Sequence, residues 1–180
     1  MSDVVIPVES FEITDEIMEK AITYMPFLEK SVWVKDNAEK CLKDVVIENG
    51  AVTTSVKGED LIQKSVLLLS TLISYYLGVE IKTDDLEENP FTLYQIYDYY
   101  ASGNPSGQLE KYKRNERYSE KAYAILQDYK ELKRLLDTEI YNLRNAHNDI
   151  FAKIEALASL IPQENAETET ATEKEVSNEQ

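Results

Sequence analysis

Apolar residues recur along most of this chain at the three- and four-residue spacing of helix faces, which predicts a mostly helical protein. The first helical segment follows Thr14, a residue type favoured at helix N-caps. Asp15 and Glu16 then lie in the first turn, where the helix dipole favours acidic side chains. We expect this helix to stop or restart at Pro26. The residues it would bury are Ile17, Met18, Ala21, Ile22 and Met25.

Two further helices are expected before the middle of the chain, and one after it. A looser helical pattern covers residues 27–46, and the stretch 59–77 is apolar nearly all round. A helix without a polar face belongs in the centre of a domain, so we expect this stretch to be the most buried segment, ending at Gly78. Asn89 and Pro90 suit the cap and first position of another helix. The looser pattern consists of Leu28, Val32, Ala38, Cys41, Leu42 and Val45.

One stretch, residues 45–56, has a different pattern, with β-branched residues on both sides of the pair Asn49–Gly50. An Asn-Gly pair between such runs favours a tight β-hairpin. The other interpretation is that the preceding helix continues to a C-cap at Gly50 and is followed by a loop. An isolated two-stranded ribbon is only marginally stable, so both interpretations stay open.

The segment from Gln108 to Ile161 contains neither proline nor glycine in 54 residues, which favours one long helix after a loop at 104–107. From Leu126 onward its apolar residues recur in heptads over five repeats, which predicts a coiled-coil seam. Poor helix formers at 145–149 are the place where this helix could instead kink or turn back. The seam positions are Leu126, Lys133, Ile140, His147, Ile154 and Ile161 and, three residues further on in each repeat, Tyr129, Leu136, Leu143, Ile150 and Leu157.

These patterns predict an all-α fold, with a helical N-terminal domain, a long coiled-coil-like C-terminal helix and, under one interpretation, a short β-hairpin near 45–56. We expect the helical domain to cover residues 1–107 and the long helix residues 108–162. Residues 163–180 contain six glutamates and a single large apolar side chain. Such a segment buries too little surface to offset its ordering entropy, so it is predicted to be a disordered acidic tail.

The amino-acid composition limits which partners and ligands the protein is expected to bind. Acidic residues outnumber basic ones 34 to 19, for a formal net charge of −15. A chain with this charge repels nucleic-acid phosphates and anionic membranes, so we expect no direct nucleic-acid or membrane binding. The single cysteine, Cys41, allows no disulfide within the chain, and one histidine is too few for a zinc site of Cys and His alone. With no glycine-rich phosphate loop or calcium loop either, the sequence predicts no metal, no cofactor and no small-molecule substrate.

Targeting signals are also missing from the sequence pattern. Residues Met1–Pro7 contain no basic residue of the kind that begins a secretory signal. The most apolar run, residues 66–79, is shorter than the roughly 20 residues that cross a bilayer. We therefore expect a protein that is cytoplasmic when made.

His147 is the only histidine and so the first candidate for catalysis or metal binding. No nucleophile or second imidazole accompanies it in the sequence, and perturbed groups are often structural. A polar residue at a seam position commonly sets register or oligomeric state, and the same holds for Lys133. The sequence therefore predicts no catalytic residue.

Twelve tyrosines are the most unusual feature of the composition, and four of them crowd residues 94–100. Tyrosine is enriched at interface hot spots, although helix packing with the hydroxyls at the surface is the other interpretation. We hypothesise a contact surface formed by Tyr94, Tyr97, Tyr99 and Tyr100.

The chain resembles, in overall pattern, the small acidic helical proteins encoded in the structural modules of tailed bacteriophages. The resemblance depends on the segments Met25–Lys30 and Tyr94–Tyr100 and on the long helix with its acidic tail. It includes no diagnostic motif, so no site residue is carried over from it. It implies a virion component or an assembly factor that works through protein contacts.

The sequence thus favours a non-enzymatic protein, an oligomeric structural or assembly component that binds itself or a protein partner. The alternative is an acidic inhibitor that mimics nucleic acid and blocks the groove of a basic protein, which the charge permits. An enzyme is disfavoured because the catalytic motifs are missing.

Truncation after Pro162 is expected to leave the melting temperature essentially unchanged, because the tail has almost no apolar surface to bury. Thermal unfolding of the full chain and of the truncated chain measures this directly. A drop of several degrees in the truncated chain would mean that the tail docks on the folded part.

Overall fold

The computed structural model describes residues 10–49, 52–81 and 97–158, and these residues are mostly helical with one antiparallel β-hairpin. The predicted predominance of helix is therefore confirmed. The short stretch 97–102 is helical as well. The elements are α1 (Asp15–Lys20), α2 (Phe27–Ala38), η1 (Glu39–Cys41), β1 (Leu42–Asn49), β2 (Val52–Glu59), α3 (Leu61–Thr71), η2 (Leu72–Tyr76), α5 (Pro105–Tyr112) and α6 (Ser119–Ala158).

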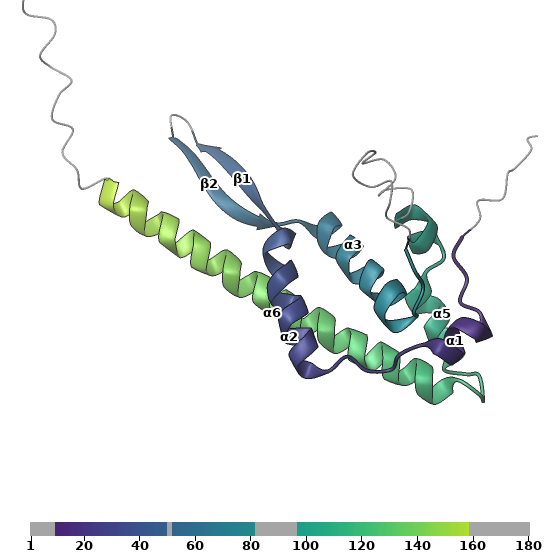
Figure 1. Ribbon diagram of the computed structural model, residues 1–180. Coiled ribbons are helices and arrows are strands. Elements are labelled where there is room, and N and C mark those ends of the chain that lie inside the picture. Colours follow the sequence, from purple (N-terminus) through teal and green to yellow (C-terminus); the bar gives the residue numbers. More distant parts are fainter. Residues whose placement is uncertain (1–9, 50–51, 82–96, 159–180) are drawn as a thin grey trace, which may run out of the picture.

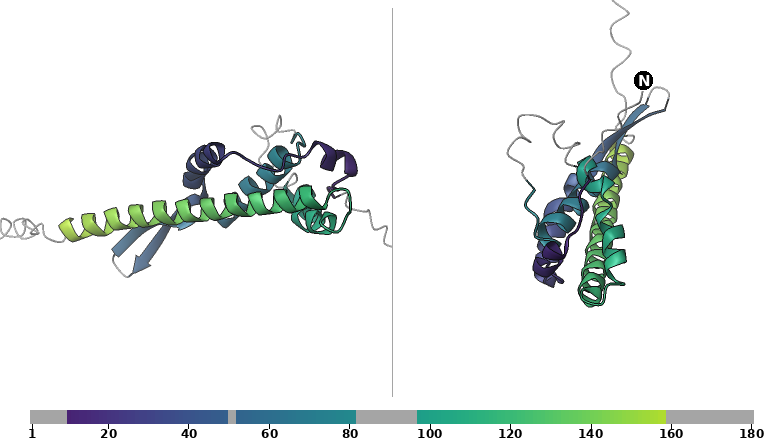
Figure 2. Two further views of the ribbon diagram at one scale, coloured as in Figure 1. Left: turned by 90° about the horizontal axis from the view of Figure 1, so that it is seen from below. Right: turned by 90° about the vertical axis from the view of Figure 1, so that its right-hand side faces the viewer.

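The longest element, α6, is the helix along which the other elements lie (Figure 1). Its 40 residues span about 60 Å at 1.5 Å per residue. The elements α2, α5, η1 and β2 all pack against it. In the left view of Figure 2 its C-terminal half runs out beyond α2 and α3, with the hairpin projecting in the same general direction. The predicted long C-terminal helix is present, and half of it extends beyond the helical core.

The first helix forms where the sequence predicts it. The hydroxyl of Thr14 accepts a hydrogen bond from the Ile17 N–H at 3.4 Å, and the chain leaves the helical conformation at Ala21. A new helix, α2, begins directly after Pro26. The expected burial of Ile22 was wrong: its amide donates to the Tyr76 carbonyl across an extended linker, and its side chain is exposed.

The β-hairpin is confirmed and is longer than the predicted 45–56. Strands β1 and β2 pair from Leu42 opposite Glu59 to Asn49 opposite Val52, so the alternative of a helix reaching Gly50 was wrong. The helix expected over residues 27–46 ends at Ala38. Because β2 also packs against α6, the ribbon has the support that an isolated hairpin lacks.

Only the second half of the apolar segment 59–77 is buried, although the whole segment was predicted to be buried. Its first turn is on the surface, where Leu61 and Ile62 are exposed. Its second half enters a turn of π-helix, in which the Leu77 N–H donates to the Leu72 carbonyl, and Gly78 ends the element at φ +62°, a conformation that favours glycine. The buried residues are Leu68, Thr71, Leu72, Ile73, Tyr76 and Leu77.

The C-terminal segment is divided into two helices. Asn104 and Pro105 were expected in a loop, but Asn104 caps α5 and Pro105 is its first residue. The chain then turns between α5 and α6, where the side chain of Asn115 accepts the Arg117 N–H at 2.9 Å and Tyr118 is buried. This break uses neither proline nor glycine, so the sequence pattern did not reveal it. In contrast, α6 continues as a helix through residues 145–149.

The buried face of α6 is shifted from the predicted seam in the first half of the helix. Ile125 and Leu132 are fully buried, one residue before Leu126 and Lys133, which are half-buried and exposed. This face packs inside the same chain, against elements that include α2 and η1. Further along the helix, Leu136 and Ile140 are buried, and Tyr129 and Leu143 are partly buried.

Three segments of the chain meet at the carboxylate of Asp128, on α6. It accepts hydrogen bonds from the Met25 N–H at 2.8 Å, the Tyr76 hydroxyl at 2.8 Å and the Lys30 ammonium at 2.5 Å. Lys30 is 1% exposed, Asp128 is 7% exposed, and the ammonium also reaches Glu131 at 2.5 Å. We call these residues the Asp128 cluster. It joins the linker before α2, helix α2 and η2 to α6.

The Asp128 cluster determines the charge state of its members. Burial opposes the charge on Lys30, but its hydrogen bonds to Asp128 and Glu131 outweigh burial and raise its pKa above the usual range. Burial, followed by the hydrogen bond to Asp128, raises the pKa of Tyr76. Burial likewise raises the pKa of Tyr129, which lies against the ring of Tyr76, to about 12. At neutral pH the lysine is therefore charged and both phenols are neutral.

The Lys30→Met variant is expected to lose about 3 kcal/mol or more of unfolding free energy, because it leaves the buried Asp128 carboxylate without a counter-charge. Lys20→Met is the matched control. Lys20 pairs with Glu16 at 2.7 Å, but the two side chains are 71% and 76% exposed, so no measurable loss is expected. Urea unfolding followed by circular dichroism measures both variants. Small and equal losses would contradict a stabilising role for the cluster.

The raised phenol pKa values predict a loss of stability in alkali. A folded-state pKa above the unfolded value of about 10 stabilises the protein below pH 10, and this contribution is lost as the pH rises toward the folded value. For Tyr129 the window runs from about pH 10 to about 12. In a titration followed by tyrosinate absorbance and circular dichroism, the late tyrosines should ionise together with loss of helix. Ionisation of every tyrosine near pH 10 with helicity retained would disprove this.

Candidate interaction surfaces

The Asp128 cluster brings several titratable side chains together, but its central groups are used in structural hydrogen bonds. At its centre the Lys30 ammonium and the Tyr76 hydroxyl both donate hydrogen bonds to the Asp128 carboxylate. Across the described residues no buried side-chain nitrogen or oxygen lacks a hydrogen-bond partner, and no group of three or more His, Cys, Asp or Glu residues is placed to hold a metal ion. None of the described helices is both long enough and apolar enough to cross a membrane. The remaining candidates are apolar surfaces.

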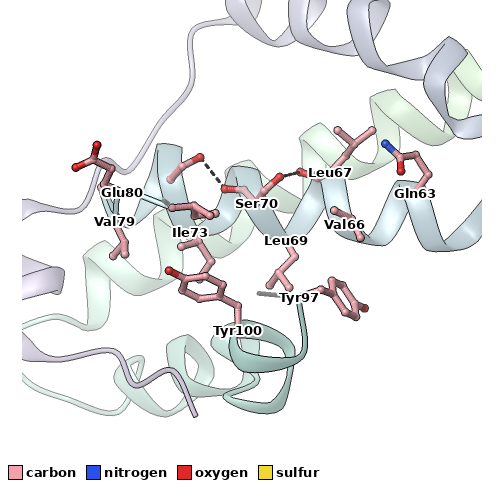
Figure 3. Close-up of a pocket in the computed structure, with 13 residues that line it drawn as sticks. Gln63, Val66, Leu67, Leu69, Ser70, Ile73, Val79, Glu80, Tyr97 and Tyr100 are labelled. Atoms are coloured by element: carbon pink, nitrogen blue, oxygen red, sulfur yellow. Dashed lines mark hydrogen bonds between the residues drawn. The ribbon is translucent and has the colours of Figure 1, made fainter. Parts of the chain in front are cut away.

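A groove of about 650 Å³ lies between α3 and the helical stretch 97–102 (Figure 3). Leu69 and Ile73 face the rings of Tyr97 and Tyr100 across it, so its walls are mainly apolar. The Ser70 hydroxyl in its wall donates to a carbonyl of its own helix at 3.0 Å. The groove is suited to apolar side chains rather than to a charged ligand. The two residues that flank the undescribed segment 82–96, Ile81 and Tyr97, both line it.

The tyrosines proposed as one contact surface are divided between two environments. Tyr94 lies outside the described residues. Tyr97 and Tyr100 line the groove, whereas Tyr99 is 40% exposed and does not line it. The rings of Tyr99 and Tyr100 contact each other with centroids 5.0 Å apart, and both lie against Phe11. The rings of Tyr99 and Tyr100 therefore help to hold the N-terminal segment at Phe11.

The C-terminal half of α6 carries an exposed row of apolar side chains. At about 100° per residue, Ile150, Ile154 and Leu157 lie on the same side of the helix as the buried Leu136 and Ile140. The same side of α6 is thus buried in the core along the first half of the helix and exposed to solvent along the second half. We call this row the open stripe; its residues, 39% to 65% exposed, are Ile150, Phe151, Ile154 and Leu157.

His147 lies where the buried face of α6 ends and the open stripe begins, and it is half-buried. Next to it, the side chain of Asn148 accepts the Lys57 N–H of β2 at 3.0 Å, so the hairpin lies against a different side of the helix. Ile161, the last predicted seam residue, lies outside the described residues. Among the predicted seam residues, Ile150, Ile154 and Leu157 are therefore the described ones whose apolar surface is mostly in solvent.

A second apolar surface lies on the outward side of α2 and was not expected from the sequence. Phe27, Leu28 and Val32 are 64%, 74% and 51% exposed, and we call them the outer α2 patch. The sequence pattern listed Leu28 and Val32 together with Ala38 and Cys41 in one loose helical pattern and did not indicate which of them would be exposed. The helix instead buries Lys30 together with Val34, Asn37 and Ala38. Lys30 lies midway between Leu28 and Val32, so it points to the opposite side of the helix. This spacing was the one feature of the sequence that could have indicated that the apolar pair and the lysine lie on different faces.

No protein-family model matches this chain, and neither does any curated protein or solved structure. The surfaces of the molecule are therefore the evidence for its function.

Proposed function

We propose that this protein acts through protein–protein contacts, as a homo-oligomeric structural or assembly component rather than as an enzyme. The observation that carries the proposal is the open stripe, an apolar helix face that extends beyond the core. Burying one aliphatic or aromatic side chain of this size contributes about 1.5–3 kcal/mol. The four side chains of the open stripe are 39% to 65% exposed, so about half of this contribution is still available to each, and burying all four in one contact favours association.

The heptad spacing supports a helix as the binding partner. Along the open stripe, Ile150 and Leu157 occupy one seam position, and His147 and Ile154 occupy the other. Knobs-into-holes packing of these rows against a second helix is the coiled-coil interpretation of the seam. Under this proposal the first half of the seam is closed within the chain and the second half is used between chains.

The resemblance to structural proteins of tailed bacteriophages supports a more specific form of the same proposal. In this form the protein is made in the cytoplasm and then incorporated into a virion or used during its assembly. Detection of the chain in purified particles, or only in assembling ones, would distinguish the two roles.

The Ile154→Asp variant is expected to be monomeric with full helicity, whereas the wild-type chain is oligomeric, because the new charge would have to be desolvated inside the contact. Ala152→Asp is the matched control, since Ala152 lies on the opposite side of the same exposed turns, and it should keep the wild-type mass. Sedimentation equilibrium with circular dichroism measures both properties. A monomeric wild-type chain at high concentration, or an unchanged mass in Ile154→Asp, would refute the proposal.

A further inference from the structure

The molecule has two separate apolar surfaces exposed to solvent, the open stripe on α6 and the outer α2 patch. Each is a helix face, and in each two apolar residues stand one turn apart: Ile150 and Ile154 in the stripe, Leu28 and Val32 in the patch. Rows of this spacing are the ridges that interlock when two helices pack. The two surfaces are therefore of the kind that fit each other.

The stripe cannot cover the patch of its own chain. The ion pairs of Lys30 with Asp128 and Glu131 hold α2 against the first half of α6. Ile154 lies 23 residues beyond Glu131 on the same helix, which is about 35 Å at 1.5 Å per residue. Figure 1 shows that α6 crosses α2 and then continues well beyond it toward its C-terminal end. Within the described residues, the open stripe and the outer α2 patch of one chain are therefore too far apart to cover each other.

Inside the chain, the buried part of this α6 face packs against α2. This part, which includes Leu132 and Leu136, lies in the core that α2 closes from the other side with Val34 and Ala38. The open stripe continues the same α6 face. In a contact between two molecules, the open stripe would pack on the outward side of α2 in the neighbour. The buried part of the same α6 face packs on the inward side of α2 in its own chain.

We propose that the open stripe of one copy docks on the outer α2 patch of the next copy. This inference rests on the proposed function and names the surface that the stripe binds. The contact joins two different surfaces, so it is head-to-tail, and repeated copies close into a ring or extend as a filament depending on the rotation between them. A single kind of contact then covers both apolar surfaces. Pairing of stripe with stripe would leave the patch in water.

A mixing experiment with complementary variants tests this contact. Ile154→Asp disables the stripe and keeps the patch, whereas Val32→Asp disables the patch and keeps the stripe. We expect each variant alone to be monomeric. An equimolar mixture should form a species of twice the monomer mass, because one intact stripe meets one intact patch and the assembly stops there.

Two same-surface mixtures are the matched controls. Ile154→Asp with Leu157→Asp has no intact stripe, and Val32→Asp with Leu28→Asp has no intact patch, so both mixtures should stay monomeric. Circular dichroism and thermal melting establish that every variant folds, and Leu28→Asp replaces Val32→Asp if the latter does not. All four positions are more than half exposed, so these substitutions lie outside the core.

The outcomes separate this inference from the proposed function. If Val32→Asp and Leu28→Asp keep the wild-type mass while Ile154→Asp is monomeric, the stripes pair with each other, and the head-to-tail contact is wrong although the oligomer is real. A monomeric mixture of Ile154→Asp and Val32→Asp also overturns the contact. A monomeric wild-type chain overturns the proposed function itself.

Discussion

The fold depends on a single buried carboxylate. Asp128 binds Lys30 and, through two further hydrogen bonds, the linker before α2 and the phenol of Tyr76. A lysine that is 1% exposed must reach its partner, so α2 has one permitted rotation about its own axis. At about 100° per residue, positions 28 and 32 then point roughly opposite to Lys30. The charge pair inside the molecule thereby places Leu28 and Val32 on its surface.

Much of the local structure could be predicted because local residues determine it. Thr14 caps its helix, Pro26 separates two helices, Gly78 ends the apolar helix, and Asn49 is the last residue of the first hairpin strand. Each of these features depends on the conformational preference of one or two residues. The break between α5 and α6 was missed because an asparagine side chain and a buried tyrosine form it, without proline or glycine.

The surfaces were harder to predict than the elements. The heptad pattern led to Ile150, Ile154 and Leu157, since periodicity is a property of the sequence alone. It could not tell which part of the seam is closed within the chain, because that depends on where α2 crosses α6. The outer α2 patch was missed for the same reason. The residue that determines which face of α2 is buried, Asp128, is 98 residues away from Lys30 in the sequence. Distant ion pairs leave no periodic pattern.

In the proposed head-to-tail assembly, the projecting half of α6 would set the distance between neighbouring molecules. Each residue added to a helix moves its tip by about 1.5 Å and turns it by about 100°, so distance and direction cannot be changed independently. Between Leu143 and Ile150, an insertion or deletion of two residues would turn the open stripe away from the side on which the core face ends. A change of seven residues would return it to nearly that side, at a distance altered by about 10 Å. In a head-to-tail assembly the spacing of neighbouring copies could therefore change only in steps close to a whole number of helical turns, such as about 7 or 11 residues.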